Sequence, residues 1–430
     1  MLQSSNHIKN RCFVSLAGTL LLLATTAAAQ TVATGDSRTV STPSFPSVCK
    51  TLTAQFTTSQ RSSPPSSDDT SRIQSALTSC AGTGKSVVLA ASGSYNAFYS
   101  ELLTVNGEGL VVSSGVTLYG GKSYYSGSEL VLIEGSNSFL GGPGTIDGRG
   151  DLIASSGTPR LVQTSSASSL TIYNITLTQA AHPNLYIEGG SGITVYGVTI
   201  KTPATRTNAD GIDIDSTSNV TVTNSYVEAG DDGIAVKTNK SAAKNITVKN
   251  SYFYGTHGLS IGSQTMYGVT NILFSGNYVY GTDLNGNVSA NANANAINVK
   301  TDEECGGTVK QVTYKNTCIY GVKHLIVVNA YYGSCSGNAG TPVFEDIVVN
   351  GVLSKSSISG AYSRFYGYNS TYPAEVYLEN ISLDTTTQSG DEYATVYRYN
   401  SNITPSGTDV TTSSFSGSGS VPTCSFDSSL

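Results

Sequence analysis

A short alternating phrase recurs along the chain between residues 170 and 390. Its first four copies read "SLTIYNITL", "GITVYGVTI", "NVTVTNSYV" and "NITVKNSYF", and later copies read "NILFSGNYV", "QVTYKNTCI", "DIVVNGVLS" and "NISLDTTT". In each copy β-branched residues alternate with polar ones, a small polar corner follows, and a second short run begins. The pattern predicts pairs of short strands joined at a tight corner.

The copies are spaced like the coils of a solenoid. The intervals are 23, 27, 26 and 26 residues, then 40, 35 and 34, between Leu170, Ile193, Val220, Ile246, Ile272, Val312, Ile347 and Ile381. Leucine-rich repeats have a similar period, but their leucine framework is absent from this chain. We therefore predict an all-β fold, a right-handed parallel β-helix of roughly 20 to 25 residues per coil, with loop insertions in the later coils.

The open ends of a solenoid must be covered, and the segment "DDTSRIQSALTSC" offers a cap at the amino end. Asp68 or Asp69 stands in the N-cap position, and four small or apolar residues follow at helical spacing. These four are Ile73, Ala76, Leu77 and Cys80. The pattern predicts a short amphipathic helix that covers the first coil.

The remaining segments complete the predicted domain layout. Residues 1–29 run from Lys9 and Arg11 through an apolar stretch to Ala29, which is the layout of a secretory signal peptide. The apolar stretch itself is too short to span a membrane as a helix. Residues 30–46 are predicted to be a flexible segment, and residues 47–430 a single β-helix domain whose Gly/Ser-rich tail wraps the far end. We expect a secreted, extracellular protein that is not embedded in a membrane.

Composition narrows the range of partners. The 430 residues are 12% charged and carry a formal net charge of −6, which becomes −8 once Lys9 and Arg11 leave with the signal peptide. An acidic chain of this kind argues against nucleic acid as a partner.

Six cysteines remain after Cys12 leaves with the signal peptide, and an even number in a secreted chain predicts disulfides. We expect Cys49 to pair with Cys80, because both lie in the predicted amino-terminal cap. The other four, which allow three connectivities, are Cys305, Cys318, Cys335 and Cys424. Sequons for N-glycosylation begin at Asn174, Asn219, Asn239, Asn245, Asn287, Asn369, Asn380 and Asn402, a density that suits a glycosylated secreted protein.

Charged residues recur at the period of the coils. Asp231 and Asp232, in "AGDDGIAV", follow Asp210 by 21 and 22 residues, and His257 follows after 25 more. Lys300 comes after another 43, which fits one coil with an insertion. Stacked strands lie about 4.8 Å apart, so these side chains are predicted to converge on one lateral groove. A lone Gly-Asp-Asp-Gly segment is usually a solvated turn, but stacked like charges raise one another's pKa and would be avoided without a function.

These motifs resemble those of the polygalacturonases, glycoside hydrolase family 28. The family pattern is Asn-x-Asp, Gly-Asp-Asp, Gly-His-Gly and Arg-x-Lys in that order, and this chain reads "NAD", "GDD", "THG" and "NVK". The segment "GGPGTIDGRG" at 141–150 is also similar, and the likeness covers roughly residues 47–400. The chain departs from the family at Thr256, which replaces a Gly, and at Asn298, which replaces the Arg.

The resemblance implies inverting hydrolysis of α-1,4 bonds between galacturonates, with a pectic polysaccharide as the partner. Asp231 would protonate the departing oxygen, while Asp210 and Asp232 would hold the attacking water. Crowding by the two other carboxylates is expected to keep Asp231 protonated at mildly acidic pH. His257 would lie beside Asp231 and tune that protonation.

The resemblance also implies a set of substrate-binding residues. Lys300 would pair with a substrate carboxylate, helped by Arg206, and Asn298 would offer a shorter, neutral group where the family has Arg. Tyr331 falls where the family has a binding tyrosine, with Tyr332 as the alternative. Asn208 would shape the loop that carries Asp210. The implied chemistry requires no metal and no organic cofactor, and we expect a monomer.

Three other functions remain open. Action on rhamnogalacturonan or xylogalacturonan is the main alternative, because Asn298 changes the carboxylate site. A pectate lyase would use a cation held by the acidic residues and would give an unsaturated product. A non-catalytic adhesive solenoid would have no reason to align these charges. Endo or exo attack depends on whether loops such as 283–296 close one end of the groove.

Overall fold

The computed structural model describes residues 30–426 apart from 154–158, 290–293 and 334–339. The predicted signal peptide, residues 1–29, and Cys335 lie outside the described residues. Within the described part of the chain, no helix is both long enough and apolar enough to cross a membrane.

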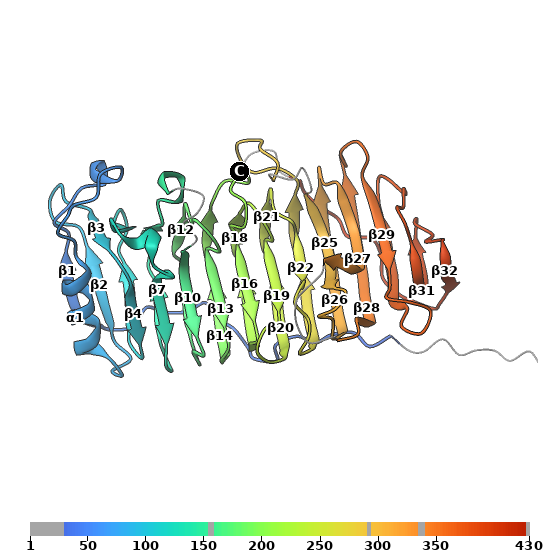
Figure 1. Cartoon of the computed structure of the whole chain (residues 1–430), viewed down its shortest axis with the longest axis horizontal. Coiled ribbons are helices and arrows are strands. Elements are labelled where there is room, and N and C mark those ends of the chain that lie inside the picture. The colour runs from blue at the N-terminus through green and yellow to red at the C-terminus, as the bar shows by residue number, and fades with distance from the viewer. Residues whose placement is uncertain (1–29, 154–158, 290–293, 334–339, 427–430) are drawn as a thin grey trace, which may run out of the picture.

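The chain winds into an elongated parallel β-helix with three stacks of strands along its length (Figure 1). The first stack contains β1 (Val48–Thr53), β2 (Ser86–Ala90), β5 (Gly109–Val112), β8 (Phe139–Gly141), β11 (Thr171–Tyr173), β14 (Ser191–Tyr196), β17 (Ser218–Thr223), β20 (Ala243–Lys249), β23 (Val269–Ser275), β26 (Thr308–Tyr320), β28 (Val343–Lys355), β30 (Ala374–Ser382), β31 (Glu392–Ser401) and β32 (Thr408–Ser414). The second contains β3 (Ala97–Ser100), β6 (Thr117–Gly120), β9 (Thr145–Asp147), β12 (Thr176–Thr178), β15 (Thr199–Lys201), β18 (Tyr226–Glu228), β21 (Tyr252–Tyr254) and β24 (Tyr278–Tyr280), and it continues into the second half of β26. The third contains β4 (Leu103–Asn106), β7 (Glu129–Glu134), β10 (Arg160–Ser165), β13 (Leu185–Glu188), β16 (Ile212–Asp215), β19 (Ile234–Lys237), β22 (Leu259–Ile261), β25 (Asn295–Asp302), β27 (His324–Gly333) and β29 (Tyr362–Tyr366).

The predicted repeat is confirmed over most of its length. Ile193 pairs with Val220, and the register continues through the aligned positions to Ile347. The last aligned residue is wrong, because Ile347 pairs with Val376 and Ile381 pairs with Val352. The phrase at Ile381 has the same alternation as the others but lies after the corner, in the part of β30 that corresponds to the second strand of earlier coils.

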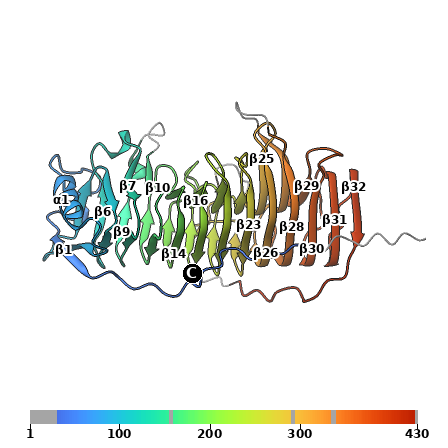
Figure 2. The ribbon, with the colours of Figure 1, turned by 90° about the horizontal axis from the view of Figure 1, so that it is seen from below.

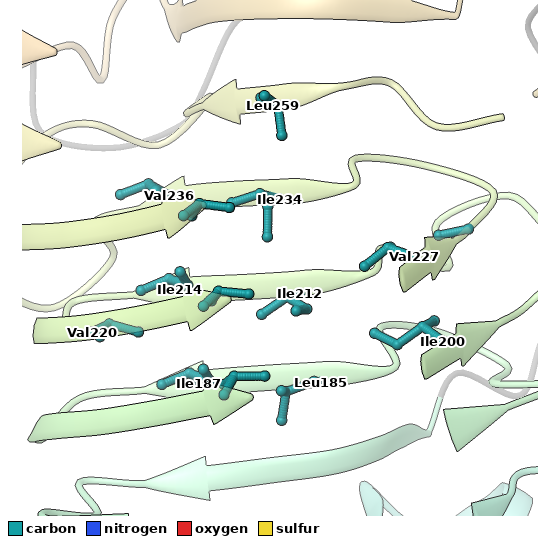
Figure 3. Close-up of a cluster of buried hydrophobic side chains, with 14 of the residues drawn as sticks. Leu185, Ile187, Ile200, Ile212, Ile214, Val220, Val227, Ile234, Val236 and Leu259 are labelled. Carbon is teal, nitrogen blue, oxygen red and sulfur yellow. The ribbon is translucent and has the colours of Figure 1, made fainter. Parts of the chain in front are cut away.

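The core is built from side chains that repeat once per coil (Figure 3). Leu185, Ile212, Ile234 and Leu259 pair in consecutive strands of the third stack, and all four are fully buried. Burying one such side chain contributes about 1.5 to 3 kcal/mol relative to leaving it exposed. The outward positions of the same strands are thereby left for polar residues, and these form the site described below.

The predicted capping helix is α1 (Thr70–Cys80), and it lies at the amino-terminal end of the solenoid (Figure 1). Its residues Ile73, Ala76, Leu77 and Cys80 are buried as predicted. Asp69 occupies the N-cap position, but the carboxylate that accepts the Thr70 amide belongs to Asp68. Three further one-turn helices are η1 (Thr58–Gln60), η2 (Tyr124–Ser126) and η3 (Gly150–Leu152).

Disulfides hold both ends of the chain. The predicted bond between Cys49 and Cys80 is confirmed and joins β1 to α1. Cys318 bonds to Cys424, so the carboxyl-terminal tail is attached to β26. Cys305 is disulfide-bonded as well.

Residues 30–46, which we call the N-terminal strap, differ from the prediction of a flexible segment. The strap lies along the outside of the coils, as the blue chain beneath the strands in Figure 2 shows. The backbone amides of Ala33 and Asp36 donate to the Thr313 and Thr247 hydroxyls, both at 2.9 Å. Polar side chains at matching positions of two coils, on either side of the coil that carries Leu273, therefore bind the backbone of the strap.

An asparagine ladder runs along one corner of the solenoid beneath the strap. Asn271 Nδ2 donates to Asn245 Oδ1 at 2.9 Å, and Asn245 Nδ2 donates to Asn219 Oδ1 at 3.0 Å. Asn271 Oδ1 also accepts the backbone amides of Thr34 at 2.8 Å and Gly35 at 2.9 Å. Asn219 and Asn245 begin predicted sequons, so a glycan on either would break this ladder.

Candidate active site

A cleft of about 350 Å³ lies over the outward face of the third stack, near the middle of the solenoid. It is lined by Arg160, His182, Pro183, Tyr186, Asn208, Asp210, Asp213, Asp231, Asp232, Lys237, Asn239, Gly262, Ser263, Gln264, Lys300 and Tyr332. The three predicted aspartates and Lys300 are therefore brought together.

The turns that lead into β16 and β19 position the aspartates. The Gly211 amide donates to the Asp232 carbonyl at 2.8 Å, and the His257 amide donates to the Asp231 carbonyl at 2.8 Å. A Cβ atom at Gly230 would lie 1.8 Å from a backbone oxygen of the preceding coil. Glycine beside the aspartates thus lets the aspartate-bearing turns of adjacent coils stack closely.

Asp231 pairs with His257, as predicted. The His257 Nδ1 atom lies 2.9 Å from Asp231 Oδ1, and the His257 Nε2 atom lies 3.0 Å from the Ser289 hydroxyl. The Asp231 side chain is 24% exposed, whereas the side chain of Asp232 is 4% exposed. Both aspartates line the cleft, and Asp231 is the more accessible of the two.

The pKa of Asp231 is lowered rather than raised, so the prediction that crowding keeps it protonated is wrong. Burial raises the pKa of Asp231, but the hydrogen bond and charge of His257, followed by the charge of Lys300, outweigh it and bring the pKa to about 2. For His257, burial lowers the pKa, but the hydrogen bond to Asp231 outweighs burial and raises it. The pair therefore holds its proton on His257.

Asp232 forms an ion pair with Lys300. The Lys300 ammonium donates to both carboxylate oxygens of Asp232, at 2.9 and 3.1 Å, and the Ser260 hydroxyl donates to Oδ1 at 2.6 Å. Burial raises the pKa of Asp232, and the nearby charges of Asp231 and Asp210 add to that rise against the opposing charge of Lys300. Asp232 is thus a buried carboxylate whose only ion-pair partner among the described residues is Lys300.

A second lysine site was not predicted from the sequence. Lys237 Nζ lies 3.1 Å from Asp210 Oδ2 and 3.0 Å from Asp213 Oδ2. Burial and the adjacent Asp210 raise the pKa of Asp213 well above its usual range. The signal was present in the strand alternation, because "GIDID" and "IAVK" place Asp213 and Lys237 on the outward face of their strands.

Two predicted substrate-binding residues do not line the cleft. Asn298 is only 2% exposed, and its Nδ2 donates to the Ser260 hydroxyl at 3.2 Å. The Tyr331 side chain does not line the cleft. Its hydroxyl donates to the backbone carbonyl of Tyr368, and its ring stacks on the Tyr368 ring. The alternative residue, Tyr332, lines the cleft with its ring 4.6 Å from Lys300 Nζ.

Of Asn208 and Arg206, which were also predicted to act at the site, one lines the cleft and the other does not. Asn208 lines the cleft, in the left-handed conformation with φ of 55° that shapes the turn before Asp210. Arg206, expected to help Lys300, instead directs its Nε at the Ala181 carbonyl at 3.3 Å and is not among the lining residues.

The donor set suits proton transfer better than binding of a metal ion. One ligand atom each from Asp231, Asp232 and His257 lies within 4.8 Å of the others. Two of these groups already hydrogen-bond each other, and the third carries the ammonium of Lys300, whose charge repels a cation. A calcium site needs six to eight oxygen ligands, which this cluster does not supply.

Comparison with known proteins gives the family. Residues 80–403 match the family model for glycosyl hydrolases family 28. The chain belongs to this family. It is therefore a glycoside hydrolase, as the resemblance of its four motifs implied.

Relatives and solved structures extend the comparison. An endo-polygalacturonase from Pectobacterium carotovorum is 33% identical over 388 residues, which is 81% of this chain and 90% of that protein. The solved polygalacturonase from Erwinia carotovora superposes with a TM-score of 0.71 at 31% identity, over 86% of this chain and 100% of that chain. A probable endo-xylogalacturonan hydrolase from Neosartorya fischeri is 27% identical over 325 residues, 67% of this chain and 75% of that protein.

Proposed function

We propose that the protein degrades pectin by hydrolysing the α-1,4 bonds between galacturonates in polygalacturonate, with inversion at the anomeric carbon. One observation carries the proposal. Asp210 and Asp232 are each paired with a lysine, whereas Asp231 is paired with His257 and reaches the cleft. An inverting glycosidase needs a carboxylic acid that protonates the departing oxygen and a carboxylate that activates water, and these aspartates offer groups for both roles.

Asp231 is the proposed general acid, and its proton comes from His257. Before substrate binds, the charges of His257 and Lys300 keep Asp231 ionised. A substrate carboxylate that pairs with Lys300 offsets one of those charges, and the sugar removes water from Asp231. Both changes favour the transfer of the proton from His257 Nδ1 to Asp231, which then protonates the leaving oxygen.

Asp210 and Asp232 are proposed to hold the attacking water, and one of the two carboxylates accepts its proton as the water attacks. Lys237 and Lys300 fix their positions from either side, so the two carboxylates face the cleft with little rotational freedom. Neither carboxylate forms a covalent bond to the sugar. The water attacks the anomeric carbon from the side opposite the departing oxygen.

Xylogalacturonan remains the alternative substrate, because a relative that covers two thirds of this chain is named as an endo-xylogalacturonan hydrolase. The loss of the family Arg carries less weight as a reason for this alternative, because Asn298 is buried and does not line the cleft. Secretion, cleavage near Ala29 and a monomeric state are part of the same proposal.

The test is product analysis with purified protein. It should release reducing ends from polygalacturonate in the presence of a chelator and produce no absorbance from a new double bond. Proton NMR of the first product should show the β-anomer. A calcium-dependent unsaturated product would establish a lyase instead, and an initial α-anomer would contradict the assigned roles of the aspartates.

A further inference from the structure

The charges of the cleft raise the question of how it attracts a polyanion. Four carboxylates line it, but the two lysines that line it already pair with three of them. Burial lowers the pKa of the nearby His182, which favours its neutral form. Because both lysines are also held by carboxylates, they do not give the cleft an excess of positive charge, and an unpaired cation would strengthen its attraction for a galacturonate chain.

Arg160 is a cleft-lining cation without a carboxylate partner. Among the described residues, none of the acidic side chains lies within 4.0 Å of its guanidinium. The one hydrogen bond of its side chain runs from Nη1 to Gln163 Oε1 at 2.7 Å. A guanidinium has five N–H donors, so most of them remain for a ligand in the cleft.

The guanidinium is also held in a fixed orientation. Its central carbon lies 3.9 Å from the centre of the Tyr186 ring, and the Tyr186 hydroxyl is bonded to Asp215 Oδ2 at 2.5 Å. A stacked arginine with a second contact at Gln163 loses little side-chain entropy when it binds a carboxylate in a bidentate manner.

Arg160 and Lys300 flank the catalytic turn along the solenoid axis. Arg160 opens β10, the turn with Asp231 leads into β19, and Lys300 lies in β25. β10 lies three coils before β19, which corresponds to about 14 Å, and β25 lies two coils after β19, which corresponds to about 10 Å. A galacturonan laid along the cleft therefore meets one cation on each side of Asp231.

We propose that Arg160 binds the carboxylate of a galacturonate that lies between the scissile bond and the amino-terminal end of the solenoid. Arg160 would thereby select a de-esterified galacturonate at that position. The inference rests on the proposed function, since it assigns a uronate to one part of the same cleft. A methyl ester at that position would leave the guanidinium without its anionic partner, at the cost of the charge-assisted part of the interaction.

The experiment measures binding of hexagalacturonate by the full-length protein with Asp231→Asn, which cannot consume the ligand. Adding Arg160→Gln should raise Kd ten- to a hundredfold, the range expected for one charge-assisted hydrogen-bonded contact. It should also reduce the salt dependence of Kd, because one ionic contact is lost. A purely structural role for Arg160 would not change the salt dependence.

The matched control is Lys240→Gln, which removes the same charge from an exposed lysine that pairs with Glu188 outside the cleft. It should leave Kd within twofold. Equal effects of the two substitutions, or a change below twofold for Arg160→Gln, would overturn the proposal. If Arg160→Gln fails to fold, Arg160→Lys serves as the test, with a two- to tenfold rise in Kd for the free acid and none for the fully methyl-esterified hexamer; equal rises would overturn it.

Failure of this inference can be told apart from failure of the proposed function. If the wild-type protein cleaves no polygalacturonate, the proposed function fails first. If it cleaves polygalacturonate and Arg160→Gln binds as tightly as its parent, only the role of Arg160 is wrong.

Discussion

Asp231 and Asp232 are neighbours in the chain, yet their pKa values shift in opposite directions. Burial acts on both, but His257 lowers the pKa of Asp231, whereas the burial of Asp232 is only partly offset by Lys300. One turn of four residues thus presents an open carboxylate with a proton donor behind it and a closed carboxylate fixed by an ammonium. This asymmetry is the basis for assigning them different roles.

Replacing Asp231 by Asn should abolish the proposed acid step. The amide cannot donate the proton to the leaving oxygen, and such assistance is typically worth about 10² to 10⁴ in rate. We expect kcat on polygalacturonate to fall by that factor while the circular dichroism spectrum is retained. The control is Asp409→Asn on the exposed strand β32, which should act like wild type. Full activity of the Asp231 variant would refute the assignment.

The pH profile should report the Asp231–His257 pair. Below the raised pKa of His257 the pair holds one proton, and kcat/KM should fall as the pH rises through that pKa. In His257→Gln the proton must reside on Asp231 itself, so the alkaline limb should move to lower pH. Ser289→Ala, which keeps the bond between His257 and Asp231, should shift the limb less. An alkaline limb at the same pH in His257→Gln would show that the pair does not hold the catalytic proton.

At the scale of elements, the strand periodicity was sufficient to predict the coils and the file of charges, because both repeat once per coil. The helical spacing of apolar residues was sufficient to predict the capping helix. The pairing of those charges was not predictable. Lys237 and Lys300 reach carboxylates 24 to 68 positions away in the chain, and side-chain length decides which one each contacts.

The choice between Tyr331 and Tyr332 shows a second limit. Neighbouring residues of a strand face opposite sides, so a shift of one position exchanges them. The pairing of β25 with β27 is irregular between Lys300 and Asp302, where Lys300 pairs with Asn329 and Asp302 pairs with Gly333. Irregularities of this kind leave no periodic signal in the sequence.

The asparagine ladder should stabilise the strap measurably. Asn271→Ala removes hydrogen bonds to Thr34, Gly35 and Asn245, each worth about 0.5 to 1.5 kcal/mol, so the free energy of unfolding should fall by about 2 to 4 kcal/mol. Urea denaturation gives the value. Asn174→Ala is the control, because Asn174 has the same left-handed backbone, with φ of 51°, but is exposed. A loss no greater than that of the control would show that the ladder does not stabilise the strap.

At the scale of the whole molecule, two of the disulfides close loops of different length. Cys318 and Cys424 are 106 positions apart, and Cys49 and Cys80 are 31 apart. Chain-entropy arguments assign about 5 and about 4 kcal/mol to such loops. Replacing Cys318 and Cys424 by Ser should therefore lower the free energy of unfolding by about 1 kcal/mol more than replacing Cys49 and Cys80 by Ser, as measured by urea denaturation. A smaller loss for the longer loop would indicate that loop entropy does not dominate.

The strap also sets an order of events during synthesis. Gln30 contacts Glu379, and the Thr31 amide contacts Asp346, so residues that are made before all of the coils bind two of the later coils. The coils pair mainly with their immediate neighbours and can assemble as they emerge. The strap has no surface to bind until most of them exist. It is therefore made early and docked late, and while it waits its polar partners along the corner of the coils stay open to solvent.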